Sequence, residues 1–304
     1  MGTIGELGEF GLIGRLTRRL PQGPAVRLGP GDDAAVVAAP DGRVVATTDL
    51  LVDGRHFRRD WSGPYDIGRK AAAQNLADVV AMGARPTALL IGFAAPAGTE
   101  TAWAERLYDG FADECGAAGA SVAGGDVVSA PQITLAVTAL GDLGGAAPLT
   151  RSGACPGDVV AVRGRLGFAS AGLELLTGGR AGAAELIAAH RRPEPPYGAG
   201  GEAREYGATA LLDVSDGLVQ DLGHIADASG VRIEIDSASV PVPEILGPDG
   251  LRHALTGGED HAFAGVFPGP PPPSWSRIGV VTTGSGVRVD GGEPPSGGWD
   301  HFAV

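Results

Sequence analysis

Six short acidic clusters, each joined to glycine, a hydroxyl residue or an amide residue, are spread along this 304-residue chain. They are Gly31-Asp32-Asp33, Thr47-Thr48-Asp49, Asn75-Leu76-Ala77-Asp78, Gly124-Gly125-Asp126, Asp213-Val214-Ser215-Asp216-Gly217 and Gly257-Gly258-Glu259-Asp260. Most follow an apolar run, so we expect the carboxylates to gather at one edge of a sheet. Clustered carboxylates stay ionised only when a cation compensates them, and their hard oxygens suit Mg²⁺ or Mn²⁺. Beside glycine-rich turns, such ions predict an enzyme that handles a polyphosphate such as Mg²⁺–ATP.

Each cluster alone also has an ordinary structural explanation. Gly31–Asp33 is a common kind of turn, Thr47–Asp49 reads as a plain strand end, and Asp216 could simply cap a helix. Asp78 is harder to explain, because it lies on an apolar helix whose nearest basic residue, Lys70, is two turns away. A buried carboxylate needs a partner, so a metal is the stronger interpretation there.

Two of the clusters have features that suit phosphate as well as metal. Gly124 and Gly125 would let the backbone approach a phosphate closely, while Asp126 holds a cation. A helix cap does not account for Asp213, which ends an apolar strand two residues before Ser215. Helix N-termini favour anions, so we expect that turn to serve metal and phosphate together.

A few basic side chains are further candidates for binding. His56 could contact a phosphate or heteroatom of a substrate, or be a partly exposed loop histidine. Arg151 could clamp a polyphosphate, or be a surface arginine of a linker. His190, His224 and His253 show no metal-ligand spacing and read as structural or exposed.

Composition excludes several classes of protein. With 36 acidic and 23 basic residues the net charge is −13, which argues against nucleic acid and anionic membranes as partners. No apolar stretch approaches the roughly 20 residues that span a bilayer, and Met1 to Arg19 lacks the order of a signal peptide. We therefore expect a soluble, cytoplasmic protein. The 2 cysteines are too few for a disulfide framework or a thiolate zinc site.

Hydrophobic periodicity predicts alternating strands and helices, hence an α/β or α+β fold. The expected helices are Glu9–Leu20, Asp66–Met82, Thr101–Gly116, Ser170–Leu176, Ala181–His190 and Ser215 to about Ala228. The expected strands are Val44–Asp49, Pro86–Ala94, Ser121–Ala123, Gln132–Leu140, Asp158–Val162, Ala210–Asp213 and Val231–Ile235. Leu143 to Pro156 has few large residues and is the predicted boundary between domains 1–145 and 146–304.

The ordered set of motifs resembles the thiamine-monophosphate kinase family. That family belongs to the superfamily of aminoimidazole ribonucleotide synthetase, selenophosphate synthetase and the hydrogenase-maturation dehydratase. Besides the six clusters, the resemblance includes Gly8-Glu9-Phe10-Gly11-Leu12-Ile13, His56-Phe57, Ala81-Met82-Gly83-Ala84, Leu149-Thr150-Arg151-Ser152-Gly153 and Trp299-Asp300-His301-Phe302. It thus covers nearly the whole chain. Two positions depart from it: His261 replaces a usual tyrosine, and Ala77 replaces a usual serine.

The resemblance implies a fold of two α/β domains whose N-terminal sheet pairs across a homodimer. It implies ATP-dependent, direct in-line phosphorylation of thiamine monophosphate to thiamine diphosphate. Several Mg²⁺ ions would be held by Asp33, Thr47, Thr48, Asp49, Asp78, Asp126, Asp213 and Asp216. ATP would contact Gly125, Asp126, Arg151 and Ser215, and thiamine monophosphate would contact His56, Glu259 and Trp299. Asp49, Asp78 and Arg151 would serve catalysis by bridging ions and neutralising phosphate charge.

Two alternatives remain open on sequence grounds. One is another ATP-dependent enzyme of the superfamily. The lack of a cysteine segment near the N-terminus argues against selenophosphate synthetase, and the lack of a C-terminal cysteine tail argues against the hydrogenase-maturation enzyme. A nucleotide sensor that binds Mg²⁺–ATP without turnover is the other, and ATP consumption would separate the two.

Overall fold

The computed structural model describes residues 2–30, 34–179 and 182–299. The chain divides into two compact units, which are described separately. The first unit comprises Met1–Val79 and Ala84–Ala146, and the second comprises Val80–Gly83 and Ala147–Val304. Among the described residues, no helix has both the length and the apolar character needed to cross a membrane.

The described part of the first unit is built on a four-stranded mixed sheet with the order β3-β6-β4-β5. The strands are β3 (Val45–Val52), β4 (Arg85–Ala95), β5 (Ser121–Ser129) and β6 (Thr134–Asp142). β6 runs antiparallel to β3 and β4, whereas β4 and β5 are parallel. A small antiparallel ribbon is formed by β1 (Val26–Leu28) and β2 (Val36–Val37). The helices are α1 (Ile4–Leu7), α2 (Glu9–Thr17), α3 (Pro64–Ala81) and α4 (Thr101–Ala118).

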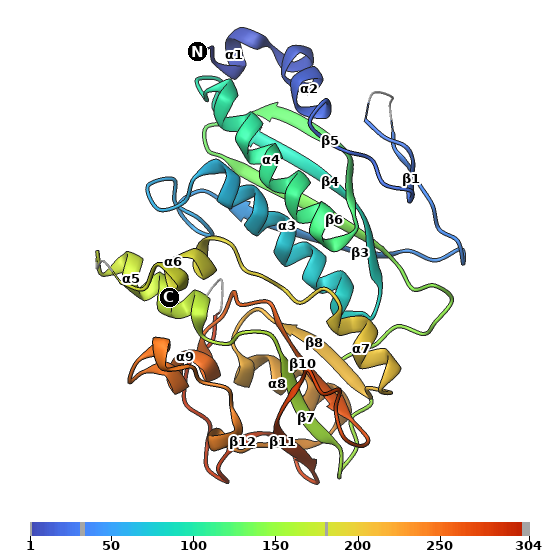
Figure 1. The fold of residues 1–304 in the computed structure, drawn as a ribbon, viewed down its shortest axis with the longest axis vertical. Helices are drawn as coiled ribbons and strands as arrows, with labels where there is room; N and C mark the ends of the chain where they lie inside the picture. Colours follow the sequence, from blue (N-terminus) through green and yellow to red (C-terminus); the bar gives the residue numbers. More distant parts are fainter. Residues whose placement is uncertain (1, 31–33, 180–181, 300–304) are drawn as a thin grey trace. The chain divides into compact units, whose positions relative to one another are not determined.

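Helices α3 and α4 cover one face of this sheet (Figure 1). Side chains alternate in burial along β6, where Leu135, Val137 and Ala139 are buried, as expected when only one face of a strand is covered. The two helices approach closely because glycine lies at their contact. A Cβ added at Gly68 of α3 would come within 2.0 Å of the Leu107 carbonyl oxygen on α4.

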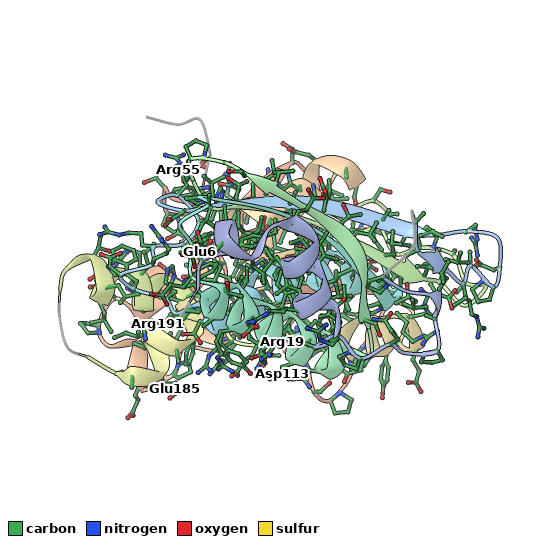
Figure 2. The ribbon with its side chains drawn as sticks, turned by 90° about the horizontal axis from the view of Figure 1, so that it is seen from above. Glu6, Arg19, Arg55, Asp113, Glu185 and Arg191 are labelled. Carbon is green, nitrogen blue, oxygen red and sulfur yellow. The ribbon has the colours of Figure 1, made fainter. Side chains whose placement is uncertain are left out.

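Ion pairs fix α2 against α4. Arg15 contacts Glu105 at 3.1 Å, and Arg19 contacts Asp109 at 2.7 Å. Figure 2 labels Arg19 at the end of α2 beside α4. Because these pairs are partly exposed, each contributes little to the free energy of unfolding, and they chiefly fix the orientation of α2.

The described part of the second unit is built on a six-stranded sheet with the order β12-β9-β11-β7-β10-β8. All neighbours are antiparallel except β12 and β9. The strands are β7 (Val159–Arg163), β8 (Ala210–Val214), β9 (Arg232–Ile235), β10 (Ala262–Phe267), β11 (Ser276–Thr282) and β12 (Gly286–Val289). The helices are α5 (Phe168–Thr177), α6 (Ala184–Arg191), α7 (Ala199–Glu205), α8 (Leu218–Ser229) and α9 (Gly250–Thr256), with 3-10 turns η1 (Ser237–Ser239) and η2 (Glu244–Leu246). The apolar face of α8 packs on the sheet through Leu222 and Ile225.

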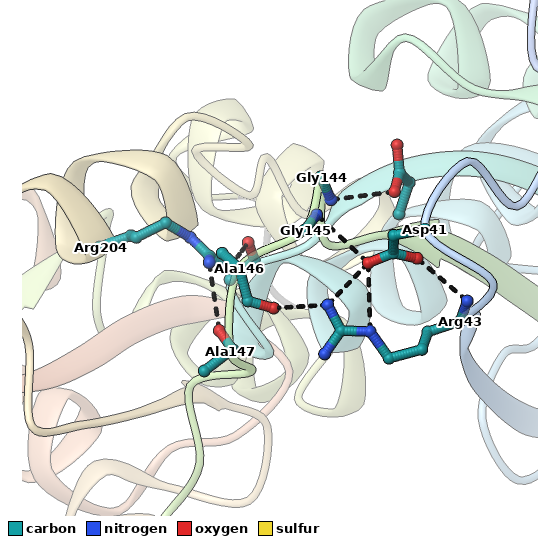
Figure 3. Close-up of polar contacts among 9 residues, drawn as sticks. Asp41, Arg43, Gly144, Gly145, Ala146, Ala147 and Arg204 are labelled. Atoms are coloured by element: carbon teal, nitrogen blue, oxygen red, sulfur yellow. Dashed lines mark hydrogen bonds and ion pairs between the residues drawn. The ribbon is translucent and has the colours of Figure 1, made fainter.

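Each unit binds its own end of the connecting segment (Figure 3). In the first unit, an Arg43 Nη atom donates to the Ala146 carbonyl oxygen at 3.0 Å. In the second unit, Arg204 donates to the Ala147 carbonyl oxygen at 3.1 Å and to the Gly83 carbonyl oxygen at the end of α3. The connection is therefore held by side chains on both sides.

The predicted mixture of strands and helices is confirmed, but two motifs lie elsewhere than expected. Thr47–Asp49 was predicted to end its strand and instead lies in the middle of β3, because the apolar residues Leu50–Val52 continue its pairing with β6. Gly124–Asp126 was predicted to follow a strand, and it lies inside β5, paired with Leu90–Gly92 of β4. Asp49 and Asp126 therefore project from within strands rather than from strand ends.

Candidate functional site

In the first unit, side chains of β3 and α3 meet in one polar cluster. The Thr47 hydroxyl donates to Asp78 Oδ2 at 2.8 Å. Gln74 Nε2 donates to Asp49 Oδ2 at 3.1 Å, and the Asp49 backbone N–H donates to Asn75 Oδ1 at 3.1 Å. Thr47 and Asp49 lie two apart on one face of β3, while the others lie on α3. A threonine hydroxyl is thus one of the partners that Asp78 has on its apolar helix.

Thr48 belongs to the opposite face of β3, as the alternation of a strand requires. Its hydroxyl donates to the Val137 carbonyl oxygen at 3.0 Å and accepts from the Thr138 hydroxyl at 3.1 Å. The structure therefore brings Thr47, Asp49 and Asp78 together but does not bring the Thr48 side chain to them. The assignment of Thr48 as a ligand remains a prediction.

Gly125 and Asp126 lie on β5, beside β4. A Cβ at Gly125 would stand 1.9 Å from the Ile91 carbonyl oxygen, so only glycine lets the two strands approach here. Asp126 is exposed. Burial raises the pKa of the nearby Tyr108 phenol above its usual range, and the charge of Asp126 raises it further.

His56 lies in a tight loop after β3 whose neighbouring residue Arg55 is labelled in Figure 2. The Val52 backbone N–H donates to His56 Nδ1 at 3.0 Å, and the Val52 carbonyl oxygen accepts from the His56 N–H at 3.0 Å. A nitrogen that accepts a hydrogen bond carries no proton, so the neutral ring is protonated at Nε2. His56 can thus present a hydrogen-bond donor to a ligand.

In the second unit, the cluster between Asp213 and Gly217 links β8 to α8. Asp213, 7% exposed, lies at the end of β8, and its Oδ2 is 3.1 Å from Nδ1 of His261. Ser215 and Asp216 form the turn, and Gly217 is the N-cap of α8 with a φ of 120°. This position of a strand end, turn and helix start agrees with the sequence prediction.

Asp221, in the first turn of α8, holds that turn from below. Its Oδ2 accepts the backbone N–H of Asp216 at 3.1 Å and that of Gly217 at 3.0 Å. Burial raises the pKa of the Asp221 carboxyl to about 7, and the nearby charges of Asp213 and Asp216 add to the rise. The amides of Asp216 and Gly217 are thus bound within the chain, and the expectation that this turn serves metal and phosphate together remains a prediction.

The loop Gly257–His261 is fixed to the same turn. The Glu259 N–H donates to the Ser215 carbonyl oxygen at 2.7 Å, and Glu259 has a φ of 64°. Glu259 Oε2 lies 3.6 Å from Nδ1 of His190. Beside it, Asp260 accepts the N–H groups of Gly167 and Ala169 at the start of α5, at 2.5 and 2.8 Å. Burial raises the pKa of Asp260 to about 7.

Trp299 is held at the same turn by its main chain. Its N–H donates to the Asp216 carbonyl oxygen at 3.0 Å, and its carbonyl oxygen accepts from Gln220 Nε2 at 2.8 Å. The indole is 47% exposed, so it can offer a face to a ligand. The rest of the predicted motif, Asp300-His301-Phe302, lies outside the described residues, as do Gly31, Asp32 and the predicted ligand Asp33.

Arg151 is an exposed residue of the segment that precedes β7. Its carbonyl oxygen accepts from the Ser229 hydroxyl at 3.2 Å at the end of α8. The same hydroxyl accepts the N–H of Gly153 at 3.1 Å. The backbone of Arg151 is therefore anchored while its charged side chain reaches solvent, which suits a residue that contacts an anionic ligand.

The donor atoms of these groups fit a hard cation, although no complete ligand set is formed. In the described part of the chain, no three His, Cys, Asp or Glu side chains lie close enough together to hold a metal ion. The cluster of Thr47, Asp49 and Asp78 offers carboxylate and hydroxyl oxygen, the ligand type that Mg²⁺ prefers. Magnesium usually keeps several waters and takes further oxygens from substrate phosphates, so a partial protein set suits it.

Sequence reasoning missed the residues that position these groups. Gln74 holds Asp49, Gln220 holds Trp299, and Asp221 holds the turn before α8. One available signal was a carboxylate at a position of α8 that its apolar periodicity predicts to be buried, since Asp221 lies beside Leu222 and one turn after Leu218. Such a residue needs hydrogen-bond donors nearby.

Comparisons with known proteins agree with this geometry. The model for AIR synthase related protein, N-terminal domain, matches residues 31–143, and that for the C-terminal domain matches residues 155–266. The chain is 51% identical to the thiamine-monophosphate kinase of Mycobacterium tuberculosis, over 99% of this chain and 93% of that protein.

Two solved structures are similar over most of their length. Thiamine-monophosphate kinase from Stenotrophomonas maltophilia is 34% identical with a TM-score of 0.82, over 92% of this chain and 96% of that one. The structure "AaThiL complexed with AMPPCP and TMP" is 34% identical with a TM-score of 0.80, over 99% of both chains. The chain matches both AIR synthase related domains, and about half of its residues are identical to those of a relative over 99% of its length. The chain therefore belongs to the thiamine-monophosphate kinase family.

Proposed function

We propose that the protein transfers the γ-phosphoryl group of ATP directly to the phosphate of thiamine monophosphate, giving thiamine diphosphate and ADP. The observation that carries this proposal is the full-length similarity to a relative solved with AMPPCP and TMP. The polar cluster of Thr47, Asp49 and Asp78 supports it independently, because it supplies oxygen ligands of the kind that metal-dependent phosphoryl transfer uses.

We further propose that Mg²⁺ is the metal. When bound, Mg²⁺ would neutralise phosphate charge. In the first unit, Asp49 and Asp78 would hold it, with the hydroxyl of Thr47 and the carboxylate of Asp126 as further ligands. In the second unit, Asp213 and Asp216 would do so. Asp33 and Thr48 complete the proposed set of Mg²⁺ ligands.

The two substrates would be held by different kinds of groups, one suited to phosphate and the other to a cationic ring. Gly125 and Ser215 would approach the nucleotide through glycine backbone and a hydroxyl, and Arg151 would neutralise phosphate charge. For thiamine monophosphate, Glu259 and the exposed indole of Trp299 suit a cationic ring, because cations favour both an aromatic face and a carboxylate. His56 would donate from Nε2 to an acceptor atom of this substrate.

No strong general base is needed in this reaction, because the accepting phosphate is already an anion near neutral pH. The barrier arises from bringing two polyanions together. Positioning and charge neutralisation therefore account for most of the catalysis, in keeping with sites made of carboxylates, an arginine and hydrogen-bond donors.

The proposal is tested by chromatography of a reaction with purified protein, ATP, Mg²⁺ and thiamine monophosphate, with unphosphorylated thiamine as a parallel acceptor. We expect thiamine diphosphate from the monophosphate alone, and none when EDTA is added. ATP consumption without this product would move the assignment to another acceptor within the superfamily. No consumption at all would favour the nucleotide sensor.

The four-stranded sheet of the first unit has an exposed face that suits a homodimer. The face of β3 and β6 opposite the helices carries Thr48, Leu50, Ala136 and Thr138, and Leu50 is 59% exposed. Ala136 lies opposite Leu50 on β6, so this face presents adjoining apolar side chains, as a surface covered in an assembly does. We propose that this face pairs with a second copy of the chain. Sedimentation should give a dimer for the native protein and a monomer for Leu50→Lys; a native monomer would refute it.

A further inference from the structure

The N-terminus of α8 has an unusual cap. Its N-cap residue, Gly217, has no side chain with which to bind the first amides of the helix. Asp221, inside the first turn, reaches back instead, and a single oxygen, Oδ2, accepts the N–H groups of Asp216 and Gly217. The backbone N–H of Asp221 in turn donates to the Gly217 carbonyl oxygen at 2.9 Å. Asp221 therefore closes the turn with both its side chain and its main chain.

The carbonyl oxygens of the same turn support the neighbouring segments. Ser215 accepts from the N–H of Glu259 at 2.7 Å, and Asp216 accepts from the N–H of Trp299 at 3.0 Å. Both acceptors belong to residues at or next to the amides that Asp221 binds. The conformation of one turn thus sets the backbone positions of both segments, and Asp221, only 3% exposed, fixes that conformation from inside.

The two amides that Asp221 binds belong to the residues just before α8, which begins at Leu218. One carboxyl oxygen of the chain therefore occupies both donors and fixes the shape of the turn.

We propose that Asp221 is a positioning residue for the phosphoryl transfer: by binding the amides of Asp216 and Gly217 it holds Asp213, Ser215 and Asp216 in a cation-binding turn and, through that turn, holds Glu259 and Trp299. This inference rests on the proposed function for the roles of those residues. The hydrogen bonds themselves can be tested without any assay of activity.

The first test uses the native protein without ligands. Hydrogen exchange followed by NMR should show the amides of Asp216 and Gly217 exchanging at least about 100-fold more slowly than in an unstructured peptide, because both are hydrogen-bonded to the largely buried Asp221 carboxyl. Exchange at the unprotected rate would overturn the inference, whatever the activity of the protein.

The second test compares two variants of nearly the same shape. Asp221→Asn keeps an oxygen that can accept both amides, whereas Asp221→Leu has no acceptor. We expect Asp221→Leu to lose the protection of both amides and to lower kcat, and the apparent affinity for Mg²⁺, by about 10- to 100-fold, as loss of a supporting hydrogen bond does at other metal sites. Asp221→Asn should retain the protection and remain within about 5-fold of the native kcat.

Two controls separate this role from simple loss of structure. Asp227→Ala removes an exposed carboxylate from the same helix and should leave kcat, KM and the apparent affinity for Mg²⁺ unchanged. Gln220→Ala releases the Trp299 carbonyl oxygen alone and should raise KM for thiamine monophosphate without changing the dependence on Mg²⁺. If Asp221→Leu matches the native protein in both kcat and the apparent affinity for Mg²⁺, Asp221 has no positioning role.

The native enzyme, assayed alongside, distinguishes the two proposals. A native protein that makes no thiamine diphosphate contradicts the proposed function, whereas normal native turnover together with an unaffected Asp221→Leu contradicts only the role of Asp221. If Asp221→Leu does not fold, the exchange rates of the native amides decide the question.

Discussion

The two acidic regions of the protein hold their carboxylates in different ways. In the first unit, Asp49 and Asp78 project from the middle of a strand and from a helix, and the partners of their carboxylates include the side chains of Gln74 and Thr47. In the second unit, the turn that carries Asp216 is held by hydrogen bonds to its backbone. Side-chain partners can exchange for a metal without moving the chain, whereas backbone bonds fix the turn itself. The first cluster is thus suited to adjust to ligands, and the second to act as a rigid frame.

The largest effect is expected at the adjustable cluster. Asp78→Asn keeps an oxygen that can accept the Thr47 hydroxyl but removes the charge that would bind Mg²⁺. We expect kcat to fall by about 1000-fold or more, as when a group acting in the transition state is lost, while the melting temperature stays within a few degrees. Steady-state kinetics and thermal melting measure both, and near-normal turnover by the folded variant would refute the assignment of Asp78.

His56 offers an exception within the first unit, because a backbone amide fixes its ring. His56→Gln keeps a donor near the position of Nε2, whereas His56→Asn keeps only an acceptor for the Val52 amide. His56→Asn should raise KM for thiamine monophosphate by about 10- to 100-fold, the range for a hydrogen bond to a charged group, and His56→Gln much less.

The histidine prediction also has a spectroscopic check. In ¹⁵N-labelled protein, the neutral ring should carry its proton on Nε2, with the resonance assigned from its loss in His56→Gln. A proton on Nδ1, or equal KM values for the two variants, would contradict the role given to the ring.

A smaller effect is expected from Thr47→Val, which is close in shape and lacks the hydroxyl. Asp78 then loses the donor at 2.8 Å, and a proposed ligand is removed. The Mg²⁺ concentration for half-maximal activity should rise by about 10-fold, the lower end for such groups. Titration of activity with Mg²⁺ measures it. An unchanged value would mean that the hydroxyl neither supports Asp78 nor binds the metal.

The smallest effect concerns stability in the rigid region. Burial raises the pKa of Asp260 from 3.8 to about 7, so the folded state favours its protonated form. Its contribution is then fully present below pH 3.8 and is lost as the pH rises through about 7. Relative to Asp260→Asn, which does not titrate there, the native protein should lose stability between these values. Denaturant titrations at a series of pH values give the free energy of unfolding of each protein. Plotted against pH, the values for the two proteins should converge or cross, and parallel plots would contradict the prediction.

The comparison also explains what sequence could predict. The strand Ala210–Asp213 and the helix expected from Ser215 follow from an apolar run and a glycine turn, which are local signals, and the structure has both, with the helix beginning three residues later at Leu218. The placement of Thr47–Asp49 depends on how far β3 continues to pair with β6, which is a non-local property. The expected strand end was therefore wrong.

Other elements left little signal. α7 contains two glycines in seven residues, Ala199–Glu205, and was not predicted. β10, β11 and β12 were also missed, because glycine and proline interrupt the alternation of residues around them. Among site residues, the acids of the six clusters were visible as motifs, whereas Gln74 is recognisable only once the chain is folded.

The most direct test of the central claim follows the γ-phosphate of ATP. Native protein is mixed with γ-labelled ATP, Mg²⁺ and thiamine monophosphate and quenched in acid after less than one turnover. The account predicts label in the terminal phosphate of thiamine diphosphate and none on the protein. Label retained on the protein, or released as inorganic phosphate without thiamine diphosphate, would contradict direct transfer to this acceptor.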